Sequence, residues 1–226
     1  MAAPTHAVFQ VASRFYGWMT AQRTWREHCR KLVSEMPRQP SSPPLRIVDL
    51  GCGPGVSTFA IADERSPHGD TVLGLDFALG MLRDAQRRAP GVGLRGSTRI
   101  GWIGGDAARL PFADASIDVL TGHSFLYLLP DRAGALREAL RVLKRGGSLI
   151  LMEPNRTPSL GAALSVGRDP RFLLSMVLWR PFSRFYGRFS RQTLAETLSE
   201  AGFTGARVEE TLGGMGLLAR AVRPMA

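Results

Sequence analysis

A glycine turn is the first feature of the sequence that can do chemistry. Gly51, Gly53 and Gly55 follow the apolar run at 45–50, which predicts a buried strand. Doubly wound α/β folds bind nucleotides at a glycine turn after the first strand, because glycine accepts positive φ and lets a ligand approach the backbone. A tight strand-to-helix turn without a ligand is the alternative that three glycines alone leave open.

Acidic residues follow the next two predicted strands. Asp76 ends the second strand, 25 residues after Gly51, where a carboxylate can accept hydrogen bonds from both hydroxyls of a ribose. Asp106 and Ala107 follow the third strand, where a carboxylate and a backbone N–H can contact the edge of an adenine ring. The structural alternatives are a solvated loop carboxylate at Asp76 and a helix N-cap at Asp106.

Two apolar residues open the helix after the second strand. Phe77 and Met81 can sandwich a purine, although each by itself fits a packed core equally well. Together with the turn and the carboxylates they indicate a nucleoside pocket. A dinucleotide is disfavoured, because Val56 stands where G-x-G-x-x-G has its third glycine and no second nucleotide-binding half follows.

These segments together resemble the class I S-adenosylmethionine-dependent methyltransferases. The resemblance rests on V-D-L-G-C-G-P-G at 48–55, L-D at 75–76, M-L at 81–82, G-D-A-A-R-L-P-F at 105–112, I-D-V at 117–119 and L-R-V-L-K-R-G-G at 140–147. The resemblance implies an α/β fold with a seven-stranded, Rossmann-like, mostly parallel sheet, helices on both faces and a reversed hairpin formed by the last two strands. S-adenosylmethionine is then the expected cofactor and S-adenosylhomocysteine its product.

The resemblance also implies roles for individual residues. Asp49 is expected to help hold the methionyl ammonium group, and Thr121 and Gly122 to lie beside the methionine tail and the sulfonium. With Phe77 included, the predicted cofactor-binding residues are Asp49, Gly51, Gly53, Gly55, Asp76, Phe77, Met81, Asp106, Ala107, Thr121 and Gly122. No metal site is predicted.

Methyl transfer from a sulfonium is an in-line displacement, so the enzyme contributes mainly by orienting the acceptor and excluding water. His123, near the end of the fourth predicted strand, is the candidate base that removes a proton from the acceptor. Tyr127 on the following turn is the second candidate. The alternative for His123 is a structural histidine that caps or packs.

Residues 155–191 form the variable insert that is expected to act as a lid over the acceptor. Its apolar and aromatic side chains alternate with Arg168, Arg171, Arg180, Arg184, Arg188 and Arg191. Such a segment fits an anionic membrane surface, RNA binding through charge and stacking, or a packed lid whose arginines extend to water. The net charge of +10 favours polyanionic surroundings without choosing among these.

The absence of two motifs narrows the range of expected acceptors. T-G-H-S at 121–124 does not resemble the N/D-P-P-Y motif of amino-directed nucleic-acid methyltransferases, and E-P-N-R at 153–156 lacks the cysteine of RNA cytosine-C5 enzymes. The C-terminal runs 194–203 and 213–219 resemble those of quinone-biosynthesis methyltransferases. We therefore expect a small, apolar or lipid-like acceptor, such as a quinone precursor, a lipid headgroup or a natural product. An RNA methyltransferase, with nucleic acid as partner, and a non-catalytic cofactor-binding subunit are the alternatives.

The elements that must position these residues alternate between strand and helix, as in a parallel sheet. Strands are predicted at 45–50, 71–76, 99–103, 117–124, 148–153, 206–211 and 216–222, and helices at 57–64, 78–88, 133–143 and 193–201. Gly146 and Gly147 are expected to end the third of these helices. Residues 1–44 are predicted to form an N-terminal helical cap on one methyltransferase domain at 45–226.

Composition and cysteine usage bear on localisation. At 44% hydrophobic and 21% charged residues the chain fits an ordinary globular protein. No apolar run approaches the roughly 18 residues that span a bilayer, and Cys29 and Cys52 form no C-x-x-C pair. We expect a cytoplasmic protein, free or peripheral to the inner face of the membrane; the oligomeric state is not predicted.

Overall fold

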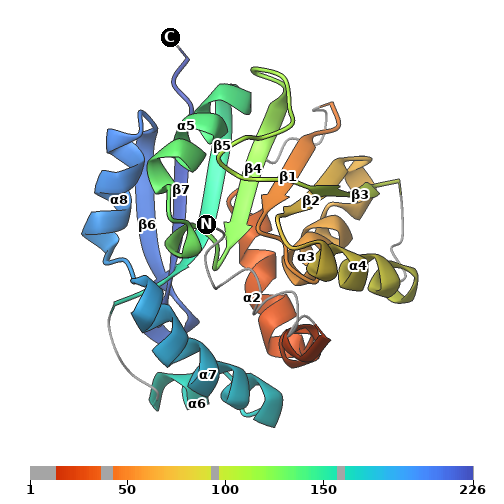
Figure 1. Ribbon diagram of the computed structural model, residues 1–226, viewed down its shortest axis with the longest axis vertical. Coiled ribbons are helices and arrows are strands. Elements are labelled where there is room, and N and C mark those ends of the chain that lie inside the picture. Colours follow the sequence, from red (N-terminus) through yellow and green to blue (C-terminus); the bar gives the residue numbers. More distant parts are fainter. Residues whose placement is uncertain (1–13, 37–42, 93–96, 157–160, 226) are drawn as a thin grey trace.

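The computed structural model describes residues 14–36, 43–92, 97–156 and 161–225 and has one seven-stranded sheet at its centre (Figure 1). The strand order is β3-β2-β1-β4-β5-β7-β6. The strands are β1 (Arg46–Leu50), β2 (Thr71–Asp76), β3 (Arg99–Gly104), β4 (Ile117–His123), β5 (Leu143–Pro154), β6 (Thr204–Thr211) and β7 (Gly216–Val222). β1 to β5 are parallel, and β7 runs antiparallel to both β5 and β6. The predicted mostly parallel sheet with a reversed C-terminal hairpin is confirmed.

Helices cover both faces of this sheet, as predicted. α2 (Arg23–Ser34) and α3 (Val56–Glu64) pack on one face, and α5 (Arg132–Val142) and α8 (Arg191–Glu200) pack on the other. Side chains alternate along β1, so Ile47 enters the core under α2 and α3 while Val48 enters the core under α5 and α8. A central strand buried on both sides therefore needs apolar residues on both faces, as Ile47, Val48 and Leu50 provide.

Several boundaries differ from the sequence prediction, most of them by one or two residues. The expectation that Gly146 and Gly147 end the helix is wrong, because α5 ends at Val142 and β5 begins at Leu143. Leu143 pairs with Ile117 of β4, so strand pairing begins before the glycines. β6 likewise begins earlier than expected, at Thr204.

The region predicted as a cap contains a helix at 14–20 and α2. The parts of the predicted cap at 1–13 and 37–42 lie outside the described residues. The insert contains α6 (Gly161–Val166) and α7 (Pro170–Tyr186). Asp169 caps α7 by accepting hydrogen bonds from the backbone N–H groups of residues 171 and 172.

α2 and the insert contact each other in a small core. Trp25 of α2 packs against α7 and against the connection between β6 and β7. Its indole Nε1 donates a 2.8 Å hydrogen bond to Ser175 Oγ, 150 residues away in the sequence. α2 and α7 are thereby joined over the carboxyl ends of the strands.

Not every arginine of the insert reaches the surface. Arg180 is only 5% exposed and donates hydrogen bonds to the backbone carbonyls of Asn155 and Met215. The expectation that all six predicted arginines face an external partner or water is therefore wrong for Arg180, which fastens α7 to the sheet. Among the helices of the described segments, none combines the length and hydropathy that a membrane crossing requires.

Candidate functional site

A cavity of about 260 Å³ lies at the carboxyl ends of β1, β2, β3 and β4. The turns after these strands form one wall, and the helix at 14–20, α2 and α7 form the other. The sequence-predicted residues that line it are Gly51, Gly53, Asp76, Phe77, Met81, Asp106, Ala107 and His123. Those that the structure does not bring to the wall are Asp49, Gly55, Thr121, Gly122 and Tyr127. The residues that line the cavity lie close together because parallel strands all end at the same edge of the sheet.

The glycines of the first turn have different surroundings. Gly53 and Gly55 both have positive φ, +52° and +86°, where glycine is favoured. Among the described residues, a Cβ on Gly53 would find one atom within 4 Å, on Tyr16 at 3.9 Å. A Cβ on Gly55 would lie 2.8 Å from both Phe59 and Trp102. Gly53 therefore leaves room for a ligand, whereas Gly55 leaves room for the protein's own core.

We expect Gly53→Ala and Gly55→Ala to act differently. A left-handed backbone costs each alanine about 1 to 2 kcal/mol. Gly55→Ala also forces two aromatic rings apart, so its Tm should fall several degrees below that of Gly53→Ala. Gly53→Ala should instead weaken S-adenosylhomocysteine binding more strongly. Thermal unfolding and calorimetric titration of both variants check this, and equal losses of affinity would contradict it.

Asp76 is oriented by the backbone at the cavity wall. Its Oδ2 accepts a 2.8 Å hydrogen bond from the N–H of Gly53, and its Oδ1 accepts one of 2.8 Å from the N–H of Ala78. Phe77, half exposed, and Met81, 2% exposed, line the cavity nearby. A fixed carboxylate beside an open glycine and two apolar side chains fits a ribose joined to a purine.

Asp49 lies beneath the turn and not in the wall. Its Oδ2 accepts hydrogen bonds from the hydroxyls of Ser57 at 2.6 Å and Thr58 at 2.7 Å, and its Oδ1 accepts one from Thr121 at 2.9 Å. Burial raises the pKa of Asp49, and the three hydroxyls oppose that rise. In this arrangement Asp49 fastens α3 and β4 to β1, and Thr121 serves the same contact.

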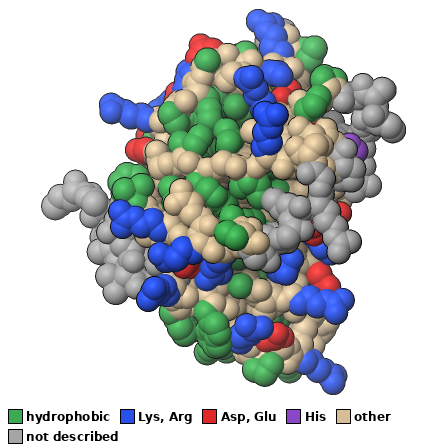
Figure 2. Space-filling model, turned by 90° about the vertical axis from the view of Figure 1, so that its right-hand side faces the viewer, with side chains coloured by type: hydrophobic (Ala, Val, Ile, Leu, Met, Phe, Trp, Pro, Cys, Tyr) green, Lys and Arg blue, Asp and Glu red, His purple; other side chains and the backbone are tan. Residues whose placement is uncertain are grey.

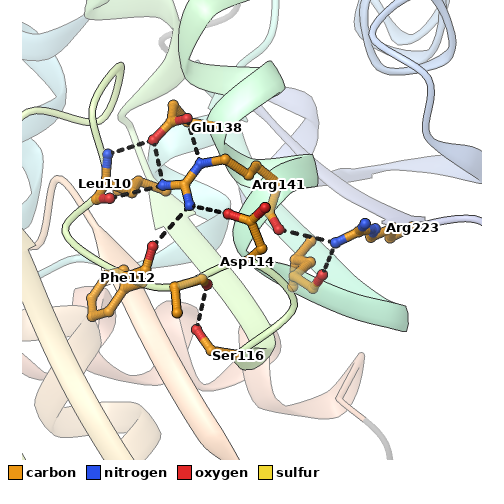
Figure 3. Close-up of polar contacts among 9 residues, drawn as sticks. Leu110, Phe112, Asp114, Ser116, Glu138, Arg141 and Arg223 are labelled. Atoms are coloured by element: carbon orange, nitrogen blue, oxygen red, sulfur yellow. Dashed lines mark hydrogen bonds and ion pairs between the residues drawn. The ribbon is translucent and has the colours of Figure 1, made fainter.

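Arg141 of α5 fastens the loop that follows β3. Its guanidinium donates five hydrogen bonds of 2.6 to 3.0 Å to the backbone carbonyls of Leu110 and Phe112 and the carboxylates of Asp114 and Glu138 (Figure 3). Glu138 also accepts a 2.8 Å hydrogen bond from the N–H of Leu110. The hydrogen bonds from Arg141 lower the pKa of Glu138. This cluster holds the loop that carries the predicted adenine-binding residues.

Arg141→Ala should release this loop without removing any group from the cavity wall. Loss of several charged hydrogen bonds should lower the free energy of unfolding by roughly 2 to 4 kcal/mol. Binding of S-adenosylhomocysteine should weaken several-fold, because the ligand must then order the loop itself. Arg137→Ala, on the exposed side of the same helix, is the matched control. Denaturant unfolding and calorimetry measure both effects, and equal stability of the two variants would contradict the role of Arg141.

The other end of the cavity is aromatic and contains His123. The ring of Trp25 meets the His123 ring edge-on, with centroids 5.3 Å apart. Trp179 of α7 packs 6.1 Å from Trp25 and also lines the cavity, as does Ser175. Trp25 and Ser175 were not predicted as site residues, because the elements that carry them meet only in the fold.

His123 has two further neighbours that the sequence analysis missed. The ring of His28 lies 5.8 Å from the His123 ring. Glu153 is buried at the end of β5 and accepts hydrogen bonds of 2.8 to 3.2 Å from the backbone N–H groups of residues 125–127. All three line a second cavity of about 10 Å³, roughly the space of one water molecule. The one sequence signal that could have identified His28 was its position three residues after Trp25, on the same face of α2.

Burial shifts the pKa values of the titratable groups in this region. It lowers the pKa of His123 to about 4 and that of His28 well below its ordinary value. It raises the pKa of Glu153 to about 7. Tyr127 is 2% exposed and burial raises its pKa well above the usual range, so its hydroxyl is a poor source of phenolate at neutral pH.

Known proteins share this architecture. Residues 48–151 match a family model described as a methyltransferase domain. A demethylmenaquinone methyltransferase from Geobacillus kaustophilus is 29% identical over 215 residues, which cover 90% of each chain.

Solved structures of other proteins are similar to this chain in their fold. A possible histamine N-methyltransferase from Thermotoga maritima has a TM-score of 0.66 at 18% identity, covering 96% of this chain and 98% of its own. The (4+2)-cyclase SpnF has a TM-score of 0.71 at 16% identity, covering 98% and 96%. One fold thus serves more than one reaction, and the site must decide the chemistry.

Proposed function

Because the chain belongs to the class I S-adenosylmethionine-dependent methyltransferases, we propose that it methylates a small apolar acceptor of the quinol type. The observation that carries this proposal is the division of one cavity into a polar end at Asp76 and an aromatic end at Trp25, Trp179 and His123. A flat apolar molecule fits between aromatic side chains. The similarity to demethylmenaquinone methyltransferases over 90% of the chain supports the same acceptor class.

S-adenosylmethionine supplies a methyl group that its sulfonium has already activated. In the proposed complex, Asp76 accepts hydrogen bonds from the ribose hydroxyls, and Gly53 allows the nucleoside to approach the backbone. Phe77, Met81, Asp106 and Ala107 line the same cavity and would hold the purine. These residues would orient the donor for in-line attack by an acceptor at the aromatic end.

His123 removes the acceptor's proton. Burial keeps its imidazole neutral at pH 7, so a ring nitrogen is free to accept. During methyl transfer, a ring nitrogen of His123 would take the proton that the acceptor loses. A histidine with a pKa of about 4 holds that proton weakly. The proton then passes through the small cavity to the carboxylate of Glu153, whose pKa is about 7.

The acceptor class is tested with S-adenosylmethionine that carries a labelled methyl group and a demethylated quinol with a short tail. We expect one labelled methyl group on the quinol by mass spectrometry, and none on the oxidised quinone, whose electron-poor ring is not a nucleophile. Label on RNA and none on the quinol would favour an RNA methyltransferase. Cofactor binding without transfer to either acceptor would favour a non-catalytic subunit.

A further inference from the structure

One side of α7 presents apolar side chains to solvent. Leu174, Val177, Leu178 and Phe185 are 39%, 55%, 43% and 83% exposed. Their spacing places them on one side of the helix, and the opposite side packs on α2 and on the β6–β7 connection. A helix that is apolar on both sides needs a second apolar neighbour.

The helix at 14–20 extends this surface. Phe15 and Trp18 are 51% and 49% exposed, and their ring centroids lie 6.0 Å apart. The guanidinium of Arg171, in the first turn of α7, lies over the Trp18 ring at 5.8 Å. We call the surface formed by these two helices the docking face; its apolar members are Phe15, Trp18, Leu174, Val177, Leu178 and Phe185.

The docking face lies on the outer side of the helices that enclose the cavity. Tyr16 and Met19 of the helix at 14–20 line the cavity, as do Ser175 and Trp179 of α7. The docking face and part of the wall of the cavity are therefore formed by the same two helices.

Basic side chains accompany the docking face. Residues 155–191 contain seven arginines and one acidic residue, Asp169. Arg184 is exposed between Val177 and Phe185 along α7, and Arg171 lies near the start of the helix. The lower part of Figure 2, at the height of α6 and α7 in Figure 1, shows exposed hydrophobic side chains beside Lys and Arg side chains.

We propose that the docking face binds an anionic lipid surface, with the apolar side chains of α7 between the headgroups and Arg171 and Arg184 on their phosphates. Charge complementarity selects this occupant, because a second copy of the chain would bring the arginines of both copies together. This proposal deepens the proposed function. Only the purpose of docking, which is delivery of a lipid-soluble acceptor, rests on the proposed function. Binding to vesicles requires no catalysis.

The test is flotation of the full chain with phosphatidylcholine vesicles that contain or lack phosphatidylglycerol. We expect salt-sensitive flotation with the anionic vesicles alone. Arg171→Gln with Arg184→Gln should lower partitioning roughly 30-fold at low salt, and Val177→Ser with Phe185→Ser roughly tenfold or more. The matched controls are Arg137→Gln on α5 and Met225→Ser, whose side chain is 73% exposed near the C-terminus; both should float like the wild type.

Other outcomes overturn the proposal. They are flotation unchanged in both double variants, equal binding to neutral vesicles, or a dimer in analytical ultracentrifugation that Val177→Ser with Phe185→Ser dissociates. Retention on RNA with no flotation also overturns it. S-adenosylhomocysteine binding and transfer to a water-soluble quinol are measured on the same variants. If these persist while flotation is absent, docking fails and the proposed function stands.

Discussion

Asp76→Ala should lower the affinity for S-adenosylhomocysteine roughly 10- to 150-fold, since a charged hydrogen bond contributes about 1.5 to 3 kcal/mol. The carboxylate is held at the cavity wall by the backbone N–H groups of Gly53 and Ala78, each at 2.8 Å. The alanine variant loses the acceptor for the ribose hydroxyls and also the anchor of the glycine turn. Both losses therefore lower the measured affinity.

Isothermal titration calorimetry measures this loss. Asp76→Asn keeps the shape of the side chain and one acceptor oxygen, so its affinity should lie between the wild type and alanine values. Asp63→Ala removes a carboxylate that pairs with Arg30 on the surface at 2.8 Å and should leave the affinity unchanged. If Asp76→Ala binds as tightly as the wild type and melts at the same temperature, the assignment of the nucleoside site is wrong.

His123→Gln should lower kcat by roughly 10² to 10⁴-fold, the usual contribution of a positioned base. Cofactor affinity should stay almost unchanged, because His123 lies at the aromatic end of the cavity and Asp76 at the polar end. Steady-state kinetics and calorimetry on the same preparation separate the two effects. An unchanged kcat would leave His123 with a packing role against Trp25.

The pH dependence of kcat tests where the proton goes. Glu153 must be ionised to accept it, and burial raises its pKa to about 7. The rate should therefore rise with pH through about 7, whereas protonation of His123 would reduce it only near pH 4. Glu153→Gln keeps an oxygen that can accept from the turn at 125–127 but should abolish the rise near neutral pH. A rise that persists in Glu153→Gln would exclude Glu153 as the proton acceptor.

The polar end of the cavity was predictable because its residues follow successive strands. Gly53, Asp76 and Asp106 each come just after a short apolar run, and parallel strands end at one edge of the sheet. Local patterns in the sequence therefore carry spatial information for this half of the site. β1, β2, β4 and β5 were predictable from runs rich in apolar residues, since parallel strands in the middle of a sheet are buried on both faces.

The direction in which a side chain points was harder to predict than the strand, helix or turn that carries it. Asp49 lies two residues before Gly51, yet it is fully buried beneath the turn, where three hydroxyls donate to it. Arg180 is one of several similar arginines in the insert, and its inward direction follows from the carbonyls of Asn155 and Met215, which it meets in the fold. Residue type alone does not distinguish these environments.

The sequence by itself determined the α/β fold and the nucleoside end of the site, because both depend on short-range patterns of apolar residues, glycines and carboxylates. Only the tertiary structure decided the acceptor end. Trp25, His123 and Trp179 come from a helix before the sheet, a central strand and a late insert, and their rings meet through contacts between distant segments. No periodicity links such segments, so their meeting depends on how α2 and α7 pack together over the sheet.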